Sequence, residues 1–100
     1  MYRLIVTVKK INGFCEVFNE GDKLIYENSS LKVAKSKSGG VCLNAVSALF
    51  PYFHALERDF KKEPNEWLHD GHEVQCPDPG PGHIGGAGTA LFEIVRERIV

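Results

Sequence analysis

The sequence lacks the features that mark several large classes of protein. No stretch approaches the roughly 20 apolar residues that a membrane-spanning helix needs, and no internal repeat or low-complexity tract is present. Neither sign of charge is in excess, since the formal net charge is -1, which argues against a broad surface for nucleic acid or acidic membranes. The opening MYRLIVTVKK places its lysines after the apolar run, the reverse of a signal peptide. We therefore expect a cytoplasmic protein that binds neither nucleic acid nor membranes.

Cysteine is scarce, and its few copies are far apart. The chain has three, Cys15, Cys42 and Cys76, and an odd number cannot pair fully within one chain. In a reducing cytoplasm all three are expected to be free thiols. No C-x-x-C occurs, so the usual sequence motif of a zinc or iron–sulfur site is absent.

The remaining composition is that of an ordinary globular chain. Hydrophobic residues make up 43% of the 100 residues and charged residues 25%, proportions that are typical of folded domains. This length allows one domain, with a core just large enough to fold alone. We therefore treat residues 1–100 as a single small domain.

Alternation of apolar and polar residues predicts strands in the first third of the chain. Tyr2, Leu4, Val6 and Val8 share one face of the first segment. The predicted strands are residues 2–11, 14–18 and 23–27, with residues 31–33 as a further short one. Asn12-Gly13 strongly favours a tight hairpin turn, and residues 19–22 predict the next turn. The expected arrangement is an antiparallel meander.

A change of period after Val41 predicts a helix. Apolar residues now recur at steps of three and four, the pattern of an amphipathic helix. They are Val46, Leu49, Phe50, Phe53, Leu56 and Phe60. Pro51 lies within this run, and an interior proline removes one hydrogen bond and clashes with the preceding turn. We expect either a kink at Pro51 or two helices, the second with Pro51 in its first turn.

The last third of the chain predicts two more strands. Residues 73–76 form a short one, whereas residues 67–71 carry no clear pattern. Residues 89–100 suit a helix by spacing, but their β-branched and aromatic content favours a strand, which we choose. The predicted fold is α+β: a mostly antiparallel sheet of four to six short strands with one proline-broken helix packed on a face.

Residues 76–88, CPDPGPGHIGGAG, contain the G-x-G-x-x-G of dinucleotide-binding loops. That motif functions between a strand and a helix within a βαβ unit. Only fifteen residues follow Gly85, too few for a helix and a second parallel strand, and Pro79 and Pro81 lack the N–H groups that a phosphate needs. We therefore reject a nucleotide site and predict a glycine-rich loop between two strands. If this loop closes over a ligand, His83 is its polar residue.

Four short motifs follow one another along the chain: C-x-x-F-x-x-G-D at residues 15–22, G-x-C at 40–42, C-P-D at 76–78 and F-x-I-x-R at 92–96. Their order and spacing resemble a family of short, uncharacterised proteins from bacteria and archaea. The resemblance covers nearly the whole chain and implies a final strand, but it brings no established activity. Many members have a shorter segment after C-P-D, so residues 79–88 are an insertion relative to them.

Cys42 is the strongest single candidate for chemistry because it opens the predicted helix. At such a position the helix dipole and the free N–H groups stabilise a thiolate, which suits a nucleophile or a metal ligand. The alternative is that each cysteine is simply a small buried apolar residue.

Taken together, the cysteines predict a shared site. Each lies at a junction: after a hairpin turn, at a helix start or at a strand end, and such junctions gather at one end of a sheet. The predicted metal ligands are Cys15, Cys42, Cys76 and His72. Three thiolates and one histidine would complete a tetrahedral zinc site, with His69 and His83 as other donors, and three thiolates with an open position suit an iron–sulfur cluster.

Two functions remain open from the sequence. The first is a small binding or accessory protein whose cysteines bind a metal or a small ligand. The second is a compact enzyme with Cys42 as nucleophile and His72 or His83 as base. We favour the first, because the sequence places no base beside the thiol.

Asp78, at a turn, is expected to bind its own backbone. An exposed sheet edge predicts a homodimer.

Overall fold

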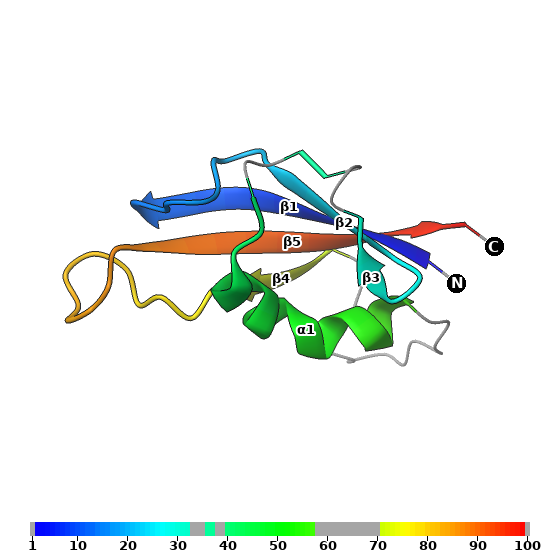
Figure 1. The fold of residues 1–100 in the computed structure, drawn as a ribbon. Helices are drawn as coiled ribbons and strands as arrows, with labels where there is room; N and C mark the ends of the chain where they lie inside the picture. The colour runs from blue at the N-terminus through cyan, green and yellow to red at the C-terminus, as the bar shows by residue number, and fades with distance from the viewer. Residues whose placement is uncertain (1, 33–35, 38–39, 58–70, 100) are drawn as a thin grey trace.

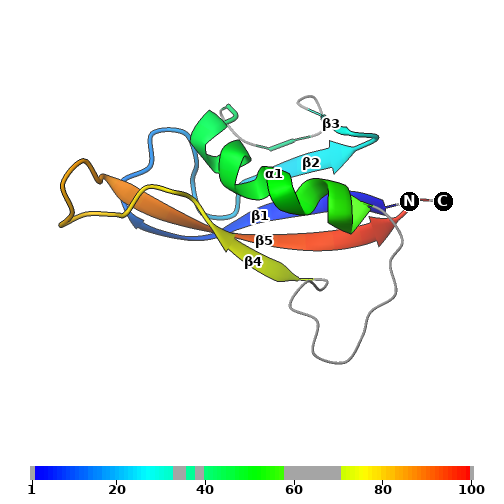
Figure 2. The same ribbon diagram turned by 90° about the horizontal axis from the view of Figure 1, so that it is seen from below.

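Five strands form one antiparallel sheet, and helix α1 packs against one of its faces (Figure 1, Figure 2). The computed structural model of the chain describes residues 2–32, 36–37, 40–57 and 71–99. In chain order its elements are β1 (Tyr2–Gly13), β2 (Lys23–Glu27), β3 (Ser30–Leu31), α1 (Leu43–Glu57), β4 (His72–Gln75) and β5 (Gly88–Arg98). The strands lie in the order β3-β2-β1-β5-β4, each antiparallel to its neighbours. The predicted α+β fold is confirmed.

The two longest strands, β1 and β5, form the centre of the sheet. They pair along their whole length, from Tyr2 opposite Arg98 to Gly13 opposite Gly88. The register shifts between Val8 and Lys10, which marks a β-bulge. The first strand and the strand predicted for the tail are therefore both present, and each is the other's main partner.

The core fills the space between α1 and the sheet face that it covers. It consists of Leu4, Val6, Val8, Leu24, Tyr26, Val74, Ala90, Phe92 and Ile94 from the strands, Phe18 from the loop after β1, and Ala45, Leu49, Phe53 and Leu56 from α1. Two ring contacts strengthen this packing. Phe18 meets Phe92 edge-on with 5.7 Å between ring centroids, and Tyr26 stacks on Phe53 at 4.4 Å.

Helix α1 continues through Pro51, so the proline does not divide it into two helices. Pro51 lies on the exposed side, where water can bind the carbonyl group that loses its intrahelical partner. The C-terminal end is fixed by two bonds: Arg96 Nε donates to the Leu56 carbonyl at 3.0 Å, and Ser29 N donates to Glu57 Oε2 at 2.8 Å. Phe60 lies outside the described residues.

The predicted hairpin at Asn12-Gly13 is wrong. β1 runs through both residues, and the predicted strand 14–18 belongs to a loop that leads to β2. Gly13 has a φ of 95°, which glycine adopts readily, but it is still paired with Gly88 of β5 and no hairpin forms there. The Phe14 amide then donates to the Ala87 carbonyl at 3.1 Å, so the local turn preference gives way to long-range pairing.

Smaller differences concern the ends of elements. β4 begins and ends one residue before the predicted 73–76, and β3 is two residues long. Val33 and residues 67–70 lie outside the described part of the chain. Residues 77–87 form a long arm between β4 and β5, drawn in yellow and orange in Figure 1. Among the described helical residues, no helix has the length and apolar character to cross a membrane.

Candidate functional site

The three cysteines line one cavity of about 200 Å³ at the end of the sheet where α1 begins. Cys15 comes from the loop after β1, Cys42 from the residue before α1, and Cys76 from the residue after β4. All three are free and half-buried. We call this cavity the cysteine pocket. Three segments far apart in the chain therefore each bring a cysteine to the lining of one cavity, as the junction argument from the sequence predicts.

Backbone hydrogen bonds fix two of the three sulfur atoms. Phe18 N donates to Cys15 Sγ at 3.4 Å, which closes a tight turn within C-x-x-F. Ala90 N donates to Cys76 Sγ at 3.2 Å, while Cys76 N donates to the Ala90 carbonyl at 3.0 Å. These two N–H donors orient the side chains of Cys15 and Cys76 at the cavity.

Cys42 caps the N-terminus of α1. The helix begins at Leu43, and Val46 N donates to the Cys42 carbonyl at 3.0 Å, so Cys42 occupies the N-cap position. No acidic residue lies in the first turn. The positive end of the helix dipole therefore faces the pocket without a carboxylate of its own helix to neutralise it. This is the position that the sequence predicts for Cys42.

The predicted metal ligands do not form a ready-made site. The described residues contain no group of three or more His, Cys, Asp and Glu side chains that could hold a metal ion. His72 lies four residues before Cys76, about 13 Å along an extended chain, and its ring packs 4.9 Å from that of Tyr52. His69 lies outside the described residues. As arranged, these side chains do not fit a tetrahedral zinc ion or an iron–sulfur cluster.

His83, the other candidate base, lies near the tip of the 77–87 arm. Its side chain is exposed, and its carbonyl accepts a bond from Gly86 N at 3.0 Å. Neither His83 nor His72 is among the residues that line the cysteine pocket. The enzyme hypothesis therefore has Cys42 in the lining of the cavity, but neither His72 nor His83 lies there with it.

Asp78 organises the base of the arm and also lines the pocket. Its Oδ1 accepts bonds from Gly80 N at 2.8 Å and Ala87 N at 3.0 Å, and its carbonyl accepts one from Thr89 Oγ1 at 2.7 Å. The N–H of Gly80, and next that of Ala87, lowers the pKa of Asp78 below its ordinary value. The turn sequence predicts the bond to Gly80, but no local pattern could have predicted the one to Ala87.

The glycines of this stretch allow backbone segments to approach each other closely. A Cβ atom on Gly86 would lie 3.2 Å from Gly80 N and closer still to the Gly80 carbonyl. A Cβ atom on Gly88 would lie 2.5 Å from Phe14 N. The G-x-G-x-x-G leads into strand β5 and not into a helix. Within that motif only Gly80 is closely packed, with its Cβ position 2.8 Å from Thr89 Oγ1, whereas Gly82 and Gly85 have open space around them.

Fold and site together define an α+β domain with a thiol-lined pocket at one end of its sheet. Comparison with models of known protein families, with curated proteins and with solved structures gives no match. The resemblance to the family of short, uncharacterised proteins therefore stays a prediction, and the case for a function rests on the pocket.

Proposed function

We propose that this protein is a small binding protein whose cysteine pocket holds a small ligand with affinity for thiols. The observation that carries the proposal is the convergence of three free thiols from distant segments on one cavity. Cysteines that only fill a core are packed on all sides by apolar side chains. Here all three cysteines pack against the core on one side, but each is only half-buried and also lines an open volume.

The size and charge of the pocket narrow the class of ligand. Drug-sized ligands need cavities of about 300–1,000 Å³, whereas this one measures about 200 Å³. Among the described residues its lining includes the carboxylates of Glu16 and Asp78 but no lysine, arginine or histidine. The lowered pKa of Asp78 keeps that carboxylate charged at neutral pH. Such a pocket repels anions and favours a small neutral or cationic ligand.

A metal ion belongs to this class only if the sulfur atoms move closer together when it binds. The proposal also assumes a reducing compartment such as the cytoplasm, because all three cysteines must remain thiols.

Two copies could pair through an edge strand such as β4. The mass of the protein in solution tests that association separately from ligand binding.

A compact cysteine enzyme is the second candidate. Its support is the position of Cys42, which lies at the N-terminus of α1 and in the lining of the cysteine pocket, where a nucleophile would be accessible to a substrate. Ligand binding needs only the thiols and the cavity, whereas catalysis needs a base as well. The binding function is therefore the better supported of the two.

Protein purified without oxygen provides the test. Native mass spectrometry with elemental analysis should find one small species per chain, and the double variant Cys42→Ser, Cys76→Ser should lose it. Ser47→Ala, an exposed change on α1, is the matched control and should retain it. If no bound species is found and the thiols alkylate as fast in the folded protein as in urea, the proposal is wrong.

A further inference from the structure

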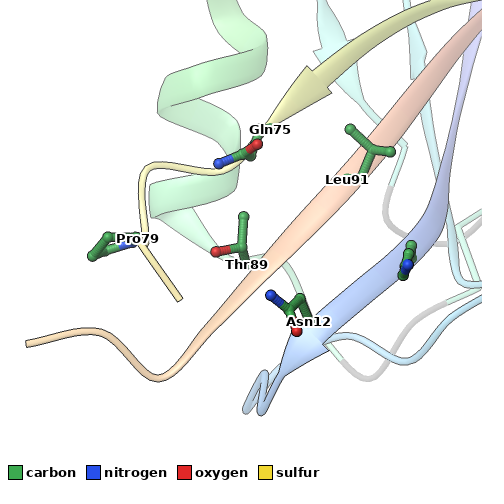
Figure 3. A pocket seen from close by; sticks show the side chains of 6 residues that line it. Asn12, Gln75, Pro79, Thr89 and Leu91 are labelled. Atoms are coloured by element: carbon green, nitrogen blue, oxygen red, sulfur yellow. The ribbon is translucent and has the colours of Figure 1, made fainter. Parts of the chain in front are cut away.

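A second cavity lies on the sheet face that α1 leaves uncovered. It measures about 420 Å³ and is lined by Lys10, Asn12, Gln75, Pro79, Thr89 and Leu91 (Figure 3). We call it the polar cavity. Ala90 and Val74 are buried in the core on the helix side. Since side chains alternate along a strand, Thr89, Leu91 and Gln75 must face the opposite side.

The register brings the lining side chains of three strands together. Asn12 lies opposite Thr89, Lys10 lies opposite Leu91, and Leu91 lies opposite Gln75. Directly opposite residues in antiparallel strands have Cβ atoms about 4.5–5.5 Å apart. Figure 3 shows Asn12, Thr89 and Gln75 following one another across the strands, with Pro79 on the arm beyond them.

The polar groups around this cavity are available to a ligand. Within the described part of the chain, the side chains of Lys10, Asn12 and Gln75 make no hydrogen bond or ion pair. The Thr89 hydroxyl donates to the Asp78 carbonyl, which leaves its oxygen free to accept. Two carboxylates, Glu93 and its cross-strand partner Glu73, lie next along the same face but do not line the cavity, and Glu93 Oε2 lies 3.8 Å from Lys9 Nζ.

The other end of the same sheet face is different. There Arg3 donates to Glu27 Oε2 and to Glu97 Oε1, both at 2.7 Å, so the charged groups satisfy one another. On this face the described polar side chains at the Arg3 end therefore bind one another, whereas Lys10, Asn12 and Gln75 at the other end make no such pairs. A cavity of about 320 Å³ also lies at the paired end, lined by Arg3, Ile5, Ile25 and Glu97, so the two ends differ in the pairing of their charged groups and not in being hollowed.

We propose that the polar cavity binds a small organic anion, a carboxylate or a phosphomonoester that also carries hydroxyl groups. Lys10 supplies the positive charge, and none of the described residues that line the cavity carries a carboxylate to oppose it. The amides of Asn12 and Gln75 each offer both donors and an acceptor, which suits hydroxyl groups. The volume lies within the range for small-molecule sites. This proposal does not depend on the cysteine pocket, which lies on the helix side of the sheet.

Titration followed by ¹⁵N–¹H NMR tests the proposal with gluconate as the carboxylate probe, glucose 6-phosphate as the phosphate probe and glucose as the neutral control. At least one anion should cause saturable shifts of the backbone amides of Lys10, Asn12, Gln75 and Thr89, and the stronger of the two identifies the preferred anionic group. Lys10→Gln should weaken that binding by at least about tenfold, since a hydrogen bond to a charged group contributes about 1.5–3 kcal/mol. Lys37→Gln removes the same charge from another exposed lysine and should leave binding unchanged.

Three results would overturn the proposal. The first is the absence of saturable shifts with either anion at millimolar concentrations. The second is binding of glucose as tight as that of the anions, which would remove the role of charge. The third is equal weakening by Lys10→Gln and Lys37→Gln, which would show a general charge effect and not a site.

Discussion

Replacing Gly88 with alanine should destabilise the domain and open the cysteine pocket. The new Cβ atom would lie 2.5 Å from Phe14 N and 2.6 Å from Phe14 C, whereas ordinary contact begins at 3.4 Å. Both neighbours are backbone atoms, so the end of β5 and residue Phe14 must separate by about 1 Å. Overpacking of this kind costs about 1–3 kcal/mol. For a domain of this size each kcal/mol lowers Tm by about 4–8 °C, which predicts a fall of roughly 5–20 °C.

Gly40→Ala is the matched control for this prediction. The nearest atom to its new Cβ would be Val17 Cγ1 at 3.8 Å, an ordinary contact. Its Tm should therefore stay within a few degrees of the wild type. Thermal unfolding followed by circular dichroism, with alkylation rates of Cys15 and Cys76, compares the two variants. If Gly88→Ala melts within about 2 °C of the wild type, the backbone of Phe14 does not approach Gly88 closely, and the packing proposed for this wall of the pocket is refuted.

Other measurements test further parts of the account. Cys42 should alkylate faster than Cys15 or Cys76 in the folded protein, because it alone caps a helix; if it reacts slowest, the enzyme hypothesis loses its nucleophile. The pKa of Asp78 is lower in the folded protein than in the unfolded chain. The charged carboxylate therefore stabilises the fold above its unfolded pKa of about 4, and this stabilisation is lost as the pH falls through the pKa of the folded state. Asp78→Asn should therefore lower Tm at pH 7, and the difference from the wild type should shrink below about pH 4; a difference that stays constant with pH would contradict this. Titration with NAD or ATP should give no saturable binding, and micromolar affinity would refute our interpretation of the glycines.

The sequence predicted those parts of the fold that depend on periodicity. The alternation around Leu4 and Val6 identified a strand with one buried face, and the spacing of Leu49, Phe53 and Leu56 identified the helix. The hairpin prediction failed because a turn preference is local, whereas the partner of β1 lies at the far end of the chain. Nothing near Asn12 shows that β5 will pair with it.

The two cavities differ in how far the sequence could predict them. The cysteines were expected at junctions between elements, and those junctions do meet. The polar cavity depends on the bulge between Val8 and Lys10, which inverts the alternation along β1. Without the bulge Lys10 would share the buried face of Leu4 and Val6. The sequence marks the shift only by the consecutive lysines after Val8 and by Ile11, which packs against the core out of step with the earlier alternation.

Chemical bridging of the thiols tests the central claim, that Cys15, Cys42 and Cys76 share one pocket. Dibromobimane is a small reagent that fluoresces once it has joined two neighbouring thiols. In the folded, reduced monomer it should bridge pairs drawn from these three residues, as located by peptide mapping, and bridging should fall strongly in urea. Single adducts on separate cysteines, or the same low bridging in folded and unfolded chains, would contradict the claim.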